Sequence, residues 1–159
     1  MIKPKPLKRF WPTTGLAIVS GMRTMASISA LSSHLAKTPS PFLTGSPLGF
    51  LQKKYVALIL KALALAEMAG DKLPQTPNRI EKPGLIGRGL AGALTGAALY
   101  KSRNGSAIAG ALVGSTVAVA ATYGSYYLRK KVVDTSNVND PTIGTLEDIV
   151  ALQTANLML

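Results

Sequence analysis

The sequence predicts an all-α membrane protein with about four transmembrane helices and a short C-terminal helix that is interfacial or re-entrant. Three observations predict this class. Four apolar segments, each close to the length of about 20 residues that crosses a bilayer, follow one another along the chain. Small residues recur within the segments at spacings of three and four, and basic residues gather at the segment ends. Both features are typical of helices packed in a membrane.

The charge balance narrows the choice of partners. The chain of 159 residues has 18 Lys and Arg against 7 Asp and Glu, which gives a net charge of +11. Such an excess fits nucleic acid, an anionic membrane surface or cytoplasmic loops. The basic residues are not interleaved with aromatics and do not follow one helical face, so we expect a lipid bilayer and no nucleic acid as partner.

The first apolar segment covers residues 13–35 and follows a basic stretch at 1–12. Pro12 suits the first turn of a helix, where a missing N–H costs nothing. A basic stretch followed by an apolar run also resembles a signal peptide, but Arg23 interrupts the run, and its apolar character extends beyond a signal's usual length. We therefore expect a retained first helix.

The next three segments cover residues 55–69, 84–100 and 105–128. In the last two, glycines lie on one helical face and permit close approach of a neighbouring helix, either within the chain, in a second copy or in a membrane-protein partner. A soluble alanine-rich bundle is the alternative, disfavoured because helices in water rarely lack a polar face over such lengths. The proposed packing glycines are Gly89, Gly92, Gly96, Gly110 and Gly114.

These segments divide the chain into a basic cytoplasmic N-terminus (1–12), a four-helix transmembrane domain (13–131) and a polar linker with a docked C-terminal helix (132–159). That last helix, at about 14 residues, is too short to span; a frayed tail is the alternative. If four helices cross, the side holding the N-terminus and residues 129–131 has the basic excess. Both termini are then cytoplasmic, in a bacterial inner membrane.

Buried charges are the candidate functional residues, because an ionised group at the bilayer centre costs at least about 2.5–3.5 kcal/mol. Arg23 and Glu67 each lie about twelve residues from the same end of two antiparallel helices, so the register predicts an ion pair. Asp71 shares the face of Glu67, Arg88 reaches a similar depth, and Lys72 lies at the mouth. The predicted cluster is therefore Arg23, Glu67, Asp71, Lys72 and Arg88.

Other chemistry is disfavoured by composition. Cysteine is absent and His34 is the single histidine, so no nucleophile, base and orienting group can be assembled, and we expect no enzyme and no cofactor. Glu67 and Asp71 alone offer too few oxygens for a hard cation, so no metal site is expected. Lys61 lies near its helix end, and we expect its side chain to extend to the membrane surface.

Three motifs resemble a known family. They are SGMR at residues 20–23, EMAGDKLP at 67–74 and EDIVAL at 147–152. The chain from Gly15 onward resembles the domain of unknown function 4126 family of small bacterial inner-membrane proteins. The resemblance implies a four-helix membrane domain and no established activity.

Two functions remain open from the sequence. The first is a transporter or channel for a small solute, with anions among the candidates, that uses the buried arginine and carboxylate cluster. The second is a non-transporting assembly or packing subunit, in which the charges only fix helix register and the glycine faces bind a partner.

Overall fold

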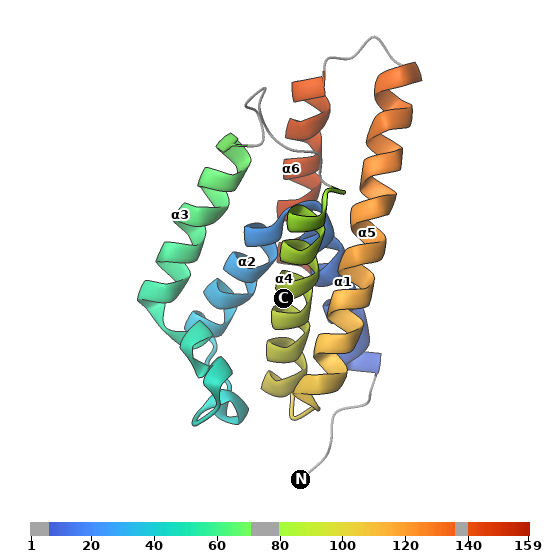
Figure 1. The fold of residues 1–159 in the computed structure, drawn as a ribbon. Coiled ribbons are helices and arrows are strands. Elements are labelled where there is room, and N and C mark those ends of the chain that lie inside the picture. Colours follow the sequence, from blue (N-terminus) through green and yellow to red (C-terminus); the bar gives the residue numbers. More distant parts are fainter. Residues whose placement is uncertain (1–6, 71–79, 136–139) are drawn as a thin grey trace.

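The computed structural model describes residues 7–70, 80–135 and 140–159, and every regular element in these ranges is a helix (Figure 1). The predicted all-α class is therefore confirmed. Two short 3₁₀ helices, η1 and η2, connect α2 to α3. The elements are α1 (Leu7–Met22), α2 (Thr24–Lys37), η1 (Pro41–Leu43), η2 (Pro47–Gln52), α3 (Lys54–Gly70), α4 (Lys82–Ser102), α5 (Ala107–Thr135) and α6 (Asp140–Leu157).

The segment expected to form one helix over residues 13–35 forms two. Arg23 separates them, with extended backbone angles (φ −140°, ψ 105°) that no helical residue adopts. Its N–H donates to the carbonyl of Val19 at 2.6 Å and so completes the last turn of α1. The expectation of a continuous first helix is wrong, because the chain leaves the helical conformation at the residue predicted to lie deepest.

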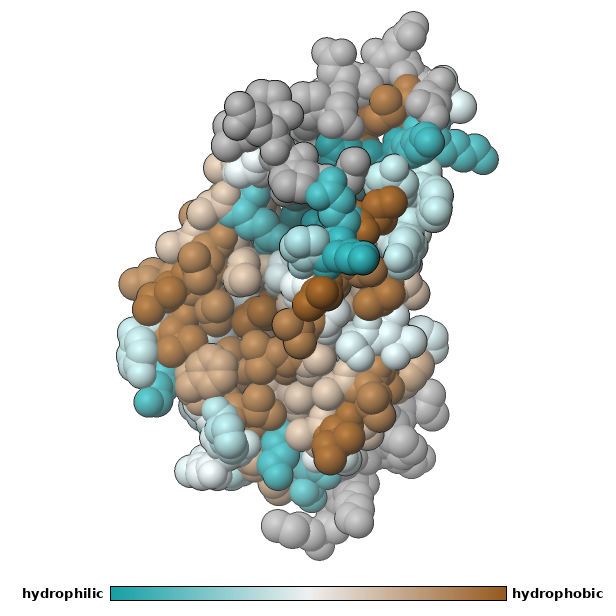
Figure 2. Space-filling view, viewed as in Figure 1, coloured by the Kyte–Doolittle hydropathy of each residue, from teal (hydrophilic) through white to brown (hydrophobic). Residues whose placement is uncertain are grey.

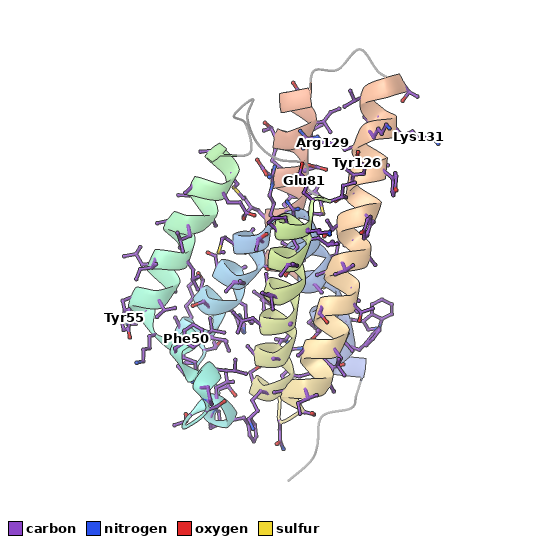
Figure 3. All side chains as sticks on the ribbon, viewed as in Figure 1. Phe50, Tyr55, Glu81, Tyr126, Arg129 and Lys131 are labelled. Carbon is purple, nitrogen blue, oxygen red and sulfur yellow. The ribbon has the colours of Figure 1, made fainter. Side chains whose placement is uncertain are left out.

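The two halves fold back on each other instead of continuing in one direction (Figure 1). α1 begins at the end of the bundle that holds the α4–α5 turn, and α2 returns to that end, where the Ser40 hydroxyl donates to the carbonyl of Ser102 at 2.5 Å. Phe50 and Tyr55 lie toward this end, whereas Arg129 and Lys131 lie toward the other (Figure 3). The start of α1 and residues 129–131 therefore lie at opposite ends of the bundle, whereas the charge count had grouped them because it assumed one crossing by the first helix. The side of a membrane on which each end lies stays a prediction.

The C-terminal segment also differs from expectation. α5 continues to Thr135 and α6 already begins at Asp140, so α6 has 18 residues, and much of the polar linker expected here is helical. α6 packs against α1 and α2, with Ala151 and Ala155 fully buried. It therefore enters the bundle from the end opposite the α1–α2 hairpin.

α4 and α5 pack along their glycines. A Cβ added at Gly92, Gly96, Gly110 or Gly114 would collide with a backbone carbonyl of the opposite helix. Gly89 is different, because a Cβ there would make ordinary contact with Val119 at 3.5 Å. Four of the five predicted packing glycines therefore lie where the two backbones touch.

The seam on α5 continues past the glycines. A Cβ at Gly21 of α1 would lie 2.7 Å from the Cβ of Ala121 and 2.9 Å from the backbone nitrogen of Thr122. One face of α5 thus packs against α4 along its first half and against α1 at the level of the break. This places the break on a closely packed support.

Apolar side chains cover the middle of the face seen in Figure 2, with hydrophilic residues toward its ends. Among the described helices, one stretch, Ala107–Val133 of α5, is long and apolar enough to cross a membrane. Crossing by the other helices stays a prediction.

A matched pair of alanine substitutions on α5 tests the seam. Gly114→Ala should lower the free energy of unfolding by about 1–3 kcal/mol, because the new methyl group forces the backbones apart. Gly124→Ala faces open space and should be neutral or stabilise by up to about 1 kcal/mol. Thermal unfolding in detergent measures both, and equal effects would contradict close packing at Gly114.

Candidate functional site

The break at Arg23 exposes the N-terminus of α2 inside the bundle. The first N–H groups of a helix have no partner within it. Here the carboxylate of Glu67 supplies one: Oε1 accepts from the N–H of Thr24 at 2.8 Å and Oε2 from that of Met25 at 2.7 Å. A helix N-terminus attracts negative charge, so α3 caps α2 with an anion.

The side chain of Arg23 points to a different helix. It is only 1% exposed, and its Nε lies 2.5 Å from Oδ1 of Asp148 on α6. Its Nη2 also donates to the carbonyl of Gly144 at 3.5 Å. A buried ion is tolerated when it is paired and hydrogen-bonded. Arg23 therefore fixes α6 against the break through both a charge and a backbone contact.

Hydroxyl groups complete the break. The hydroxyl oxygens of Ser20 on α1 and Ser27 on α2 lie 2.6 Å apart, across the change of direction. The Thr122 hydroxyl of α5 lies 2.8 Å from the carbonyl oxygen of Ala118 on its own helix and 3.2 Å from that of Gly21, and it can donate its one proton to either. The polar groups exposed by the break thus find partners on several elements.

A second ion pair lies one residue earlier on α6. Nη1 of Arg129, near the end of α5, lies 3.4 Å from Oε2 of Glu147. The sequence assigned Arg129 to a basic cluster at the membrane surface. The structure turns this side chain toward α6, and its side chain is 19% exposed. Both ion pairs therefore join α6 to the rest of the bundle.

The predicted cluster is partly assembled. Arg23 is 1% exposed and Arg88 on α4 is 7% exposed. Glu67 does lie at the level of Arg23, but it binds the backbone of the next two residues, and Asp148 takes the place predicted for it on the guanidinium. The predicted direct ion pair between Arg23 and Glu67 is therefore wrong. Asp71 and Lys72 fall outside the described residues.

Asp148 is the residue that sequence reasoning missed. In the sequence it belongs only to the motif at residues 147–152, in a C-terminal helix expected to have about 14 residues, whereas α6 begins at Asp140 and carries Asp148 about two turns in. A signal was available: Gly144, Asp148, Ala151 and Ala155 recur at spacings of four, three and four, and all four are buried. An acid on a small-residue face is placed for burial.

The site therefore consists of two carboxylates, each held by a different kind of positive group. Glu67 binds the N-terminus of α2. Asp148 binds the guanidinium of Arg23, the residue that directly precedes α2. Within the described ranges, no three His, Asp or Glu residues gather as ligands for a metal ion. Such an arrangement binds anionic groups at a helix N-terminus and at a guanidinium.

These features define a small helical bundle in which a discontinuous helix meets a buried ion pair. The chain belongs to the family described as domain of unknown function DUF4126, whose model matches residues 12–159. The family resemblance seen in the three motifs is confirmed. No curated protein and no solved structure matches the chain.

Replacement of each residue, singly and together, by an apolar residue tests the Arg23–Asp148 pair. Arg23→Met and Asp148→Leu should each cost about 3–5 kcal/mol of unfolding free energy, because each removes one member of a buried ion pair and keeps the other buried. The double variant should recover most of this loss. Thermal unfolding in detergent gives the values, and Arg129→Met with Glu147→Leu, a more exposed pair, serves as control. Additive losses at Arg23 and Asp148 would contradict the pairing.

Proposed function

We propose that the protein is a small membrane transporter that carries a small anion past the break at Arg23. The observation behind the proposal is that α2 begins within the bundle and that its N-terminus binds the carboxylate of Glu67. In membrane transporters, discontinuous helices direct their N-termini at anionic substrate groups. Glu67 occupies the position that such a substrate takes.

In this proposal α3, α4 and α5 cross the bilayer, while the α1–α2 hairpin enters from one side and α6 from the other. This replaces the four complete crossings expected from the sequence. The apolar length of α5 supports it, as do exposed side chains such as Leu65 and Leu112 on the outer faces of α3 and α5. Irregular backbone is tolerated at membrane depth only where protein buries it, and Arg23 meets that condition.

The orientation follows from the basic residues of the described helices and turns. Those at the end where α1 begins outnumber those at the opposite end, and short basic loops stay in the cytoplasm. We therefore place the start of α1 and the α2–α3 connection in the cytoplasm, at the inner membrane of a bacterium. The two groups are Lys8, Arg9, Lys37, Lys53, Lys54, Lys101 and Arg103, against Lys82, Arg129, Lys130 and Lys131.

The mechanism that we propose uses Glu67 as a tethered competitor. While ionised, its carboxylate fills the N-terminus of α2 and excludes other anions. When a proton binds Glu67, the carboxyl group loses the charge that holds it there, and a small anion takes its place. When the anion leaves on the other side, Glu67 releases its proton to that side and its carboxylate returns to the N-terminus of α2, so that one proton crosses with each anion. Arg23 directly precedes α2 and is held in place by Asp148. Its guanidinium adds positive potential at the N-terminus of α2 and attracts the anion.

The alternative of a non-transporting assembly subunit has less support. It relied on glycine faces free to bind a partner, yet Gly92, Gly96, Gly110 and Gly114 pack against one another within this chain. Further, a register-fixing network does not require a helix that stops and turns back. A transport role accounts for the break as well as the charges.

Cysteine labelling tests the topology. Cysteines at Trp11 and Lys53 should react with a membrane-impermeant thiol reagent from the same side, because α1 and α2 share one end of the bundle. A cysteine at Lys130 should react from the opposite side. The chain has no native cysteine, so each label reports one position. Reaction of Trp11→Cys from the side of Lys130→Cys would contradict the hairpin.

Flux into proteoliposomes tests the tethered competitor. A panel of chloride, nitrate, formate and inorganic phosphate is offered under an imposed pH gradient. At least one anion should accumulate with the parent protein in response to the gradient. Glu67→Ala should lose that response, because the α2 N-terminus then binds the anion without a proton, whereas exposed Glu81→Ala should keep it. An unchanged pH response in Glu67→Ala, or no flux of any panel anion with the parent, would overturn the mechanism.

A further inference from the structure

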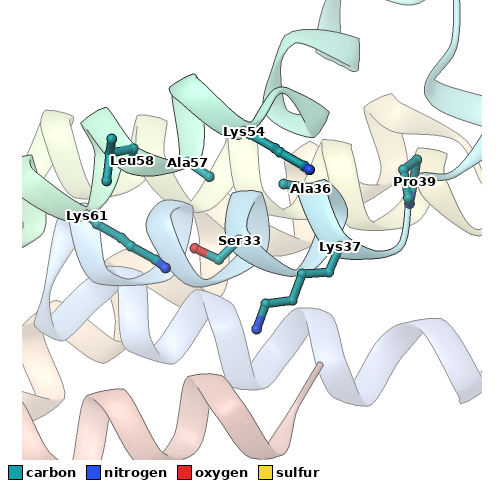
Figure 4. Close-up of a pocket in the computed structure, with 8 residues that line it drawn as sticks. All are labelled: Ser33, Ala36, Lys37, Pro39, Lys54, Ala57, Leu58 and Lys61. Atoms are coloured by element: carbon teal, nitrogen blue, oxygen red, sulfur yellow. The ribbon is translucent and has the colours of Figure 1, made fainter.

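A basic groove lies between α2 and α3, at the end of the bundle where α1 begins. It has a volume of about 560 Å³ and is lined by Lys37, Lys54 and Lys61 among eight residues (Figure 4). None of these eight residues is acidic. Three lysine side chains therefore line one space with no carboxylate in its wall. This groove is separate from the Arg23 site and has no part in the mechanism proposed above.

The wall of the groove also holds a polar group without a partner. The Oγ atom of Ser33 is buried and makes no hydrogen bond among the described residues. Lys61 extends from α3 toward it (Figure 4). A buried hydroxyl that lacks a partner costs about 1–3 kcal/mol. An oxygen-rich ligand meets the exposed lysines first, and it gains this hydroxyl as well where the wall moves to admit one of its oxygens.

The spacing along the two helices explains how these groups come together. Ser33 and Lys37 lie four residues apart on α2, and Lys54 and Lys61 lie seven apart on α3, so each pair shares one helical face. The two helices pack side by side, and the two faces meet at the groove. The sequence predicted that the side chain of Lys61 extends to the membrane surface. In the structure this side chain lines the groove.

We propose that this groove binds the phosphate headgroup of an anionic phospholipid. Lysine ammonium groups bind phosphate as point charges. Leu58, which is 70% exposed, forms part of the wall, and the apolar outer face of α3 continues beyond it to Leu65. Acyl chains fit along that face while the headgroup lies among the lysines. Basic pockets between helices on the cytoplasmic side bind acidic lipids in this way.

This inference rests on the membrane placement proposed above and not on transport. A free phosphate shares the headgroup's charge and oxygens, but it would gain nothing from Leu58 and the apolar face of α3. The lipid is therefore the occupant to which the groove points. Binding of lipid and movement of anions are measured separately, so failure of one leaves the other standing.

The test compares lipid binding by the full chain and three single variants. Native mass spectrometry in detergent measures retention of phosphatidylglycerol, with phosphatidylcholine as the zwitterionic reference. Lys54→Gln and Lys61→Gln should each weaken phosphatidylglycerol binding about fivefold, the effect expected for loss of one lysine near an anionic lipid. Lys53→Gln is the matched control, because Lys53 is adjacent in sequence but lies near the ring of Tyr55 and does not line the groove.

Each outcome bears on the proposal. Selective weakening by Lys54→Gln and Lys61→Gln, with Lys53→Gln like the parent, supports it. An equal effect of all three variants would overturn it, since general surface charge then accounts for the binding. Equal retention of phosphatidylcholine would also overturn it. In a competing arm, displacement of the lipid by millimolar inorganic phosphate at constant ionic strength would overturn the assignment to a lipid.

Discussion

A helix that begins inside a bundle must find partners for its first N–H groups, and the architecture of this protein depends on how that requirement is met at Arg23. Glu67 binds Thr24 and Met25, so α3 is held against the start of α2. Asp148 binds Arg23, so α6 is held against the same point. Each buried donor left without a partner would cost about 1–3 kcal/mol. Two carboxylates thus join four helices at one break.

This arrangement requires rigid neighbouring helices, and the close contact between α4 and α5 along their glycines provides them. Where the backbones of α4 and α5 touch, neither helix can shift without a collision. The same face of α5 presents Thr122 to the carbonyl of Gly21, one residue before α1 ends. The break therefore lies on a rigid surface on one side, while Glu67, on α3, approaches it from another element. Motion that opens the site is expected at α3.

The sequence correctly predicted those features that depend on residues close together in the chain. The spans predicted at residues 55–69 and 84–100 lie within two residues of the bounds of α3 and α4, because apolar runs bounded by charges and prolines define helices. Arg23 and Glu67 were correctly placed at one level, since helical rise converts residue counts into depth. The glycine spacing likewise identified the faces along which α4 and α5 meet.

The remaining features are not local. The apolar run continues across Arg23 without a proline. The small residues around Arg23 are also those found inside uninterrupted helices, so the motif carries no signal that a helix ends there. What stabilises the break comes from Glu67 and Asp148, far along the chain, and periodicity carries no information about such partners. For the same reason the partner of Arg23 was assigned to the neighbouring helix, although α6 supplies it.

The reversal of direction at Arg23 is the central claim, and a distance between spin labels tests it most directly. Labels are attached to cysteines at Trp11 and Phe42, both exposed, in the full chain reconstituted in lipid. If α1 and α2 fold back, pulsed electron resonance should give a separation below about 35 Å, as expected when two helical arms of about 17 and 25 Å meet at a right angle or less. A continuous helix over the same residues would hold the labels about 45 Å apart, and that result would contradict the account.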